Sequence, residues 1–139
     1  MDIYNLFALI AATFTGATMG SFLLVTLLYN TFIKSQRNLD NSLFIYRRLY
    51  RLNSVLCLLA GICAALIKNQ SAAFMLTILT VSYVFNHSHI LKGILNSCNE
   101  DFQVTNDRTY RSLSSLQNLI HLCQFGGAGY AVYLLALHN

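Results

Sequence analysis

The chain has 139 residues, of which 55% are hydrophobic and only 10% are charged. Soluble domains carry about 25% charged residues, so this composition excludes an ordinary soluble protein. A helix needs about 20 apolar residues to cross the hydrocarbon layer of a bilayer, and four apolar runs of this chain come close to that length. The sequence therefore predicts an all-α, antiparallel four-helix transmembrane bundle, formed as one domain over residues 1–139.

A first helix is expected at about 3–33. Small residues recur at every fourth position of this segment, at Ala8, Ala12, Gly16 and Gly20. Because every fourth residue returns to nearly the same side of an α-helix, one face is almost free of side chains. In lipid such a face lets another helix approach closely, so we expect it to pack against the rest of the bundle. A bulky side chain at Gly16 is then expected to disrupt the bundle.

A second helix is expected at about 42–67. It begins with Arg47, Arg48 and Arg51 among apolar and aromatic residues, which is typical of a helical segment at the level of the lipid headgroups. These arginines are candidates for contacts with anionic headgroups, and a role in membrane topology alone is the alternative. Gly61, deeper in the same helix, has a small partner four residues later and predicts a second close helix contact.

The third and fourth helices are expected at about 72–96 and 108–137. A tight connection links the third helix to the second, which predicts an antiparallel hairpin. The half of the third helix that follows Ser82 and the first half of the fourth helix are both polar. Their polar halves meet at the same end of the predicted bundle, because the two helices run in opposite directions.

All basic residues except Lys68 lie in or beside the two segments 34–41 and 97–107. The positive-inside rule places these two loops in the cytoplasm and both chain ends outside, in a multi-pass protein of the cell membrane. Since orientation already explains the basic excess, we expect membrane lipids as partners and no nucleic acid.

Three histidines and an asparagine are the candidate cofactor-binding residues: His87, His89, Asn118 and His121. Counted inward at about 1.5 Å per residue, their depths overlap, which predicts a polar pocket between the third and fourth helices. His87 and His89 point to opposite sides of a regular helix, so they cannot chelate one ion together, and no metal site is predicted. Three interpretations stay open: hydrogen bonds that set helix register, a pocket for a small molecule or lipid, and a haem site.

The acidic residues carry information through their positions, because none of them interrupts an apolar run. Ion-coupled carriers usually keep a carboxylate inside the membrane, so the sequence argues against that class. It also lacks the paired carboxylates of di-iron bundles. The acids are Asp2, Asp40, Glu100, Asp101 and Asp107.

Three parts of the chain resemble one known family. They are the small-residue first helix with Gly16 and Gly20, the basic and aromatic segment 44–52, and the serine-rich segment 111–118. Together they resemble the small four-helix membrane proteins typified by transmembrane protein 205. That family has no known biochemical function, so the resemblance implies a topology and no activity.

The functional prediction is a small multi-pass integral membrane protein that packs through small-residue helix faces, as an oligomer or as a subunit of a larger complex. The alternative is a membrane-embedded binding protein or oxidoreductase that holds haem, a quinone or another lipophilic ligand between the third and fourth helices. The sequence leaves open whether the protein is an enzyme.

Overall fold

The computed structural model describes residues 3–32, 39–98 and 106–137, and nearly all of them are helical. The helix expected at 42–67 begins earlier, and the helix expected at 72–96 is continuous but contains a π-helical turn. The elements in chain order are α1 (Ile3–Phe32), α2 (Leu39–Leu66), α3 (Gln70–Phe85), the π turn η2 (Asn86–Ile90), α4 (Leu91–Asn96) and α5 (Asp107–Ala136).

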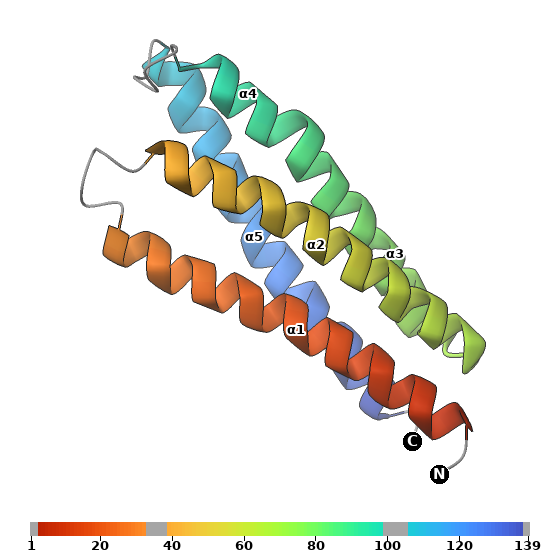
Figure 1. Ribbon diagram of the computed structural model, residues 1–139. Coiled ribbons are helices and arrows are strands. Elements are labelled where there is room, and N and C mark those ends of the chain that lie inside the picture. The colour runs from red at the N-terminus through yellow and green to blue at the C-terminus, as the bar shows by residue number, and fades with distance from the viewer. Residues whose placement is uncertain (1–2, 33–38, 99–105, 138–139) are drawn as a thin grey trace.

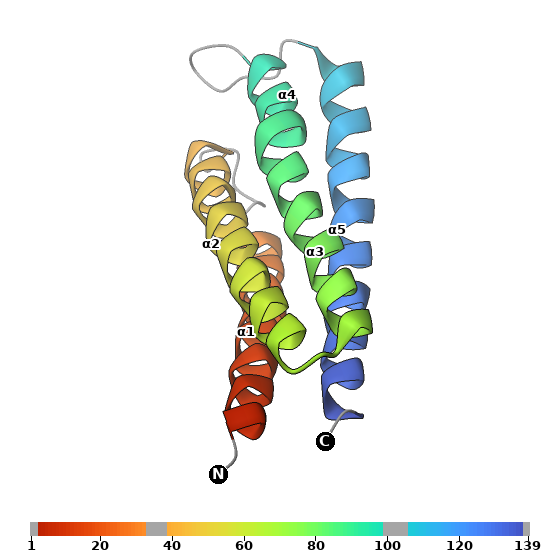
Figure 2. The same ribbon diagram turned by 90° about the vertical axis from the view of Figure 1, so that its right-hand side faces the viewer.

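The described residues form four long antiparallel helical rods, because α3, η2 and α4 follow one another without a break (Figure 1). Each rod packs against two neighbours, in the cyclic order α1, α2, α3, α5. Seen from the side, α2 and α3 form one pair and α1 and α5 lie behind them (Figure 2). In this arrangement α2 lies diagonally opposite α5. The predicted all-α four-helix bundle is confirmed.

The α2–α3 hairpin is closed by a tight turn that Asn69 stabilises. Lys68 adopts a left-handed backbone conformation with φ of 61°, which reverses the chain direction. The Asn69 side chain accepts a hydrogen bond from the amide of Ala72 (3.1 Å) and donates one to the carbonyl of Leu134 (2.9 Å). It thereby caps α3 and ties the hairpin to the end of α5. The predicted antiparallel hairpin is present.

Small residues bring α2 and α3 close together along this hairpin. Ala60 and Ala64 of α2 are fully buried, as is Ala72 of α3. A Cβ atom placed on Gly61 would lie 3.5 Å from the Cβ of Leu76, which is ordinary van der Waals contact. The close contact predicted at Gly61 is therefore present.

The inward face of α1 differs from the predicted one. Ala8 is buried as expected and Ala12 packs partly against the core, but Gly16 and Gly20 are exposed. No described atom lies within 4 Å of the position that a Cβ would take on Gly16 or Gly20. Within one chain, the prediction that these two glycines pack against the bundle is wrong. The disruption predicted for a bulky residue at position 16 stays a prediction, and the bundle of a single chain supplies no steric reason for it.

Threonines take the place of the glycines on the inward face of α1. Thr15 and Thr18 are fully buried beside Ala11. Their hydroxyl groups donate to carbonyls of their own helix, to Ala11 (2.8 Å) and to Thr15 (2.7 Å). Because these hydrogen bonds satisfy the hydroxyls locally, threonine serves there as a small side chain that packs against other helices.

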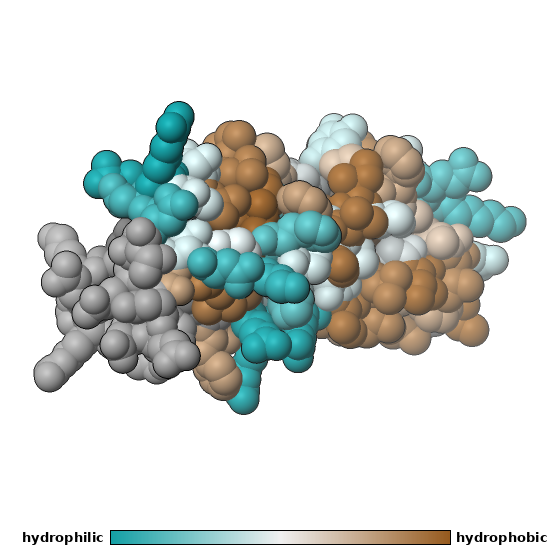
Figure 3. Space-filling model, turned by 90° about the horizontal axis from the view of Figure 1, so that it is seen from above, coloured by the Kyte–Doolittle hydropathy of each residue, from teal (hydrophilic) through white to brown (hydrophobic). Residues whose placement is uncertain are grey.

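Length and composition identify the four rods as candidate membrane spans. They are long and apolar enough over Ile3–Leu24, Phe44–Leu66, Gln70–Asn96 and Asp107–Ala136. Many large apolar side chains are exposed on their outer surfaces, including Leu24, Phe74 and Leu122. Much of the face in Figure 3 is accordingly brown, with hydrophilic residues extending inward from the end near the grey atoms. Such a surface fits a lipid environment and identifies a membrane protein.

Candidate functional site

A hydrogen-bonded chain of three buried side chains crosses the bundle interior. Tyr50 of α2 and His121 of α5 are 1% and 6% exposed, and the tyrosine Oη lies 2.6 Å from the histidine Nε2. Gln117 donates from its Nε2 to the same tyrosine oxygen (2.5 Å). The tautomer of His121 decides which of the two groups donates in the Tyr50–His121 hydrogen bond.

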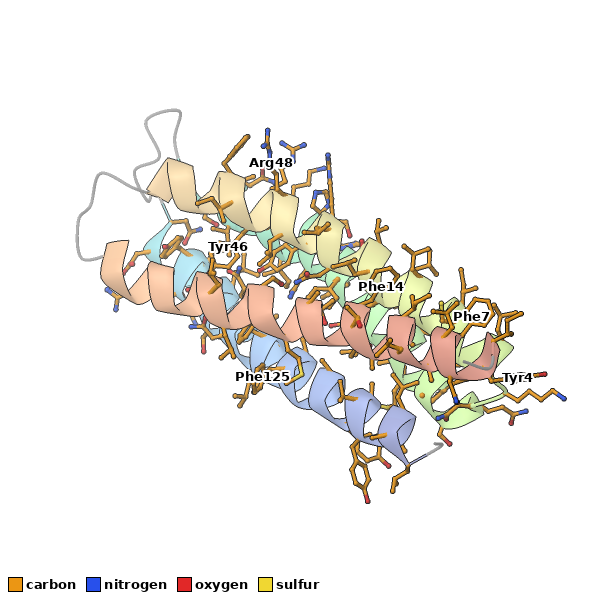
Figure 4. The ribbon with its side chains drawn as sticks, turned by 60° about the horizontal axis from the view of Figure 1, so that its bottom comes forward. Tyr4, Phe7, Phe14, Tyr46, Arg48 and Phe125 are labelled. Carbon is orange, nitrogen blue, oxygen red and sulfur yellow. The ribbon has the colours of Figure 1, made fainter. Side chains whose placement is uncertain are left out.

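Aromatic rings enclose the imidazole of His121. Tyr46 stacks against it with a centroid distance of 5.7 Å, and Phe22 meets it edge-on at 5.2 Å. Phe125 packs on Phe22 at 5.7 Å. In Figure 4 Tyr46 points into the bundle, whereas Arg48 points away from it. In this arrangement Nε2 of His121 contacts the tyrosine hydroxyl, and aromatic rings lie on two sides of the imidazole.

Three buried amide side chains form a second polar layer, one helical turn beyond the hydrogen-bonded group of Tyr50, His121 and Gln117. Asn53, Asn86 and Gln124 are each at most 1% exposed. The Asn53 side-chain oxygen accepts from the hydroxyl of Ser21 (2.9 Å), and Gln124 donates to the hydroxyl of Ser82 (2.8 Å). The layer follows the first because Asn53 and Gln124 each come three residues after a member of the hydrogen-bonded chain.

Several polar atoms of this amide layer have no hydrogen-bond partner among the described residues. They are both side-chain polar atoms of Asn86 and Gln124 Oε1, whereas the amide of Asn53 lies within reach of the Tyr83 hydroxyl. A buried polar atom without a partner costs about 1–3 kcal/mol. The layer offers donors and acceptors together, and the buried polar residues of the described ranges carry no Asp, Glu, Lys or Arg. The amide layer is therefore chemically suited to bind a neutral polar group.

The π turn η2 determines where the histidines of the third span lie. The amide of Leu91 bonds to the carbonyl of Asn86, an interval of five residues that adds one residue to the turn. Asn86, at the start of the turn, continues the buried face of α3 three residues after Tyr83, while His87 lies half-buried and His89 is exposed. Such π turns are frequent at functional sites.

The structure separates the four candidate cofactor-binding residues. His121 lies in the core, and His87 accepts a hydrogen bond from Arg51 at the surface (3.1 Å). His89 stacks on Phe85, and Asn118 is exposed. The predicted single pocket built from all four residues is wrong. No group of three or more His, Cys, Asp or Glu side chains in the described ranges is placed to hold a metal ion.

The interpretation of polar residues as links between helices is confirmed for Gln117, His121 and Gln124. Sequence reasoning missed Tyr50 and Asn53. Tyr50 stands next to Arg51, in the segment that was expected at the level of the lipid headgroups. The available signal was the spacing of three residues between Tyr50 and Asn53, which places two polar residues on one helix face.

The arginines predicted to contact lipid headgroups share one exposed face of α2. Arg47, Arg48 and Arg51 are all exposed. The Arg48 guanidinium lies over the ring of Phe44, 4.3 Å from its centroid.

No family model matches the chain, and comparisons with curated proteins and with solved structures found no significant match. The resemblance to the transmembrane protein 205 family therefore stays a prediction.

Proposed function

We propose that the protein is a small multi-pass membrane protein that self-associates through the outward face of α1. The observation that carries this proposal is the open space in front of Gly16 and Gly20, where no described atom lies within 4 Å of a built Cβ. Two glycines four residues apart on a lipid-facing surface let a second helix backbone approach closely. The bare face predicted from sequence thus serves contacts between chains.

Bulky residues beside the glycines complete a shape suited to helix association. Leu9, Leu23 and Leu24 are strongly exposed on α1. Leu23 and Leu24 fall on either side of the line through Gly16 and Gly20, and Leu9 lies on that line about two turns before Gly16; a second copy of the helix offers the same surface. Close van der Waals packing of this kind drives helix association in lipid, where the hydrophobic effect between helices is absent.

The test is the oligomeric state of a Gly16→Leu/Gly20→Leu variant in lipid nanodiscs or mild detergent, measured by single-molecule photobleaching. The wild type is expected to be a dimer or higher oligomer and the variant a monomer. Gly126→Leu is the matched control, since Gly126 on α5 is also exposed with open space around it. A variant that retains the wild-type oligomer contradicts the proposal.

A second candidate function is the binding of a neutral lipophilic ligand at the amide layer. The unpartnered atoms of Asn86 and Gln124 favour it, and so does the adjacent π turn. A carbonyl or hydroxyl group, as in a quinone or quinol, would supply the missing hydrogen bonds. Mass spectrometry of lipid extracts tests this function: a quinone that co-purifies with wild type and not with Asn86→Leu supports it, and equal extracts contradict it.

We also propose that the basic end of the bundle faces the cytoplasm. Most of the two loops, 34–41 and 97–107, lies outside the described residues. The beginning of α2, with Arg47, and the short α4, with Lys92, lie at the end where these loops connect, and the turn between α2 and α3, with Lys68, lies at the opposite end (Figure 1). Labelling of single cysteines from either side of a sealed membrane tests this orientation.

A further inference from the structure

The outer surface of α2 carries a concentration of positive charge near its beginning. Arg47 and Arg48 lie four and three residues before Arg51, so the three exposed arginines fall on one side of the helix. The single ion pair within the described parts of the chain joins Arg111 to Asp107 on α5. Arg47, Arg48 and Arg51 therefore have no acidic partner among the described residues and are open to an anion from outside this part of the chain.

The depth of the arginines matches the phosphate layer of a bilayer. The turn at Lys68 marks the opposite end of the α2–α3 hairpin. At about 1.5 Å per residue, Arg51 lies about 25 Å from Lys68 along the helix axis, and Arg47 about 31 Å. The hydrocarbon core is about 30 Å thick, so Arg47 is level with the headgroups and Arg51 lies at the hydrocarbon edge.

Arg51 is held in position by a histidine of the neighbouring span. Its Nε donates to Nε2 of His87 across the seam between α2 and η2 (3.1 Å). This hydrogen bond requires a neutral imidazole with its proton on Nδ1. The terminal nitrogens of Arg51 and the Nδ1–H of His87 have no hydrogen-bond partner among the described residues. Both residues therefore retain donors for a further ligand at the seam.

Within the basic patch formed by Arg47, Arg48 and Arg51, the contact made by Arg48 also involves no acidic residue. Arg48 rests on the ring of Phe44 (4.3 Å), a cation–π contact that fixes the neighbouring guanidinium. Large apolar side chains of the same helix, Ile45, Leu52 and Val55, are exposed beside and below the arginines. A ligand at this patch thus contacts positive charge at one end and apolar side chains at the other, which is the chemistry of a lipid.

We propose that Arg47, Arg51 and His87 bind the phosphate of one anionic lipid headgroup at the seam between α2 and η2. Planar guanidinium groups bind phosphate oxygens in pairs, and the imidazole N–H adds a further donor. The depth of Arg51 selects a membrane lipid over soluble phosphate as the source of the anion. The site is separate from the glycine face of α1, so either proposal can fail alone.

The test is native mass spectrometry of the full chain with added phosphatidylglycerol or phosphatidylcholine of identical acyl chains. We expect one phosphatidylglycerol molecule to be retained in preference to phosphatidylcholine. Arg47→Gln and Arg51→Gln are each expected to lower its retention about five-fold, the effect of one basic residue at an anionic membrane surface. Arg111→Gln and Lys68→Gln, which carry the same charge change elsewhere, are expected to retain the lipid.

Equal retention of the two lipids, or unchanged retention in the Arg47→Gln/Arg51→Gln variant, overturns the proposal. Displacement of the lipid by millimolar inorganic phosphate also overturns it, because the site then recognises a free anion. His87→Ala serves if the double variant does not fold, since it removes the partner of Arg51 at a half-buried surface position. Lower phosphatidylglycerol retention by this variant supports the site, and unchanged retention overturns it.

Discussion

The hydroxyl of Tyr50 meets the imidazole of His121 across the diagonal of the bundle, at 2.6 Å. The two helices that carry them, α2 and α5, are not neighbours in the cyclic order of the rods. A long side chain therefore connects helices whose backbones lie apart. Gln117 also donates to the hydroxyl oxygen of Tyr50, so this one oxygen contacts both Gln117 and His121 in the core.

We predict that Tyr50→Phe destabilises the bundle by about 2–4 kcal/mol, because it leaves Gln117 and His121 buried without their partner. Thermal unfolding in detergent, followed by circular dichroism, measures the effect. Tyr130→Phe is the control, since Tyr130 is exposed. Equal midpoints for the two variants contradict the prediction.

Gly127→Leu is expected to destabilise the protein by about 1–3 kcal/mol, the usual cost of overpacking. A Cβ on Gly127 would already lie 3.1 Å from Cδ2 of Leu79, so a leucine has no room between α5 and α3. Gly126→Leu, one residue away and facing open space, is expected to leave the unfolding midpoint unchanged. The prediction fails if the two leucine variants unfold together.

Asn69→Ala is expected to cost more than Asn106→Ala. Both asparagines cap a helix by accepting from an amide, that of Ala72 or of Thr109. Loss of a cap costs about 1 kcal/mol. Asn69 additionally donates to Leu134, so its replacement also leaves a buried carbonyl less satisfied. Denaturation of the two variants under identical conditions compares them, and equal losses would show that the link to α5 adds nothing.

Asn86→Leu is expected to raise the stability of the ligand-free protein by about 1–3 kcal/mol. The amide is fully buried and both of its polar side-chain atoms lack partners among the described residues, so an apolar side chain of similar size removes that cost. Unfolding midpoints of delipidated protein measure the change. Lower stability would indicate that the amide has a partner in the protein as purified.

Cys98 follows the third span, and burial raises the pKa of its thiol. The thiolate is the reactive form, so alkylation of Cys98 at pH 8 is expected to be slower than that of an unfolded peptide thiol and to rise steeply above that pH. A charged maleimide that does not enter lipid, applied to a Cys57→Ala/Cys63→Ala/Cys123→Ala variant, isolates this thiol. Equal rates for folded and unfolded protein would refute the prediction.

The four spans, the α2–α3 hairpin and the close contact at Gly61 were all predictable from sequence. Span length follows from the local count of apolar residues, and the hairpin follows from the short polar connection at Asn69. These features depend on neighbours in the chain, and the membrane imposes them on any segment that is long and apolar enough.

The inward face of α1, the π turn at Asn86 and the Tyr50–His121 link were decided by tertiary structure. In water, hydrophobicity marks the buried face of a helix, but in lipid an apolar residue is equally stable facing protein or acyl chains. Small residues occur on both sides of α1, so the pattern at Ala8 and Gly16 does not identify the inner side. Which of the two faces packs inside depends on the shapes of the neighbouring helices, and only the assembled bundle determines them.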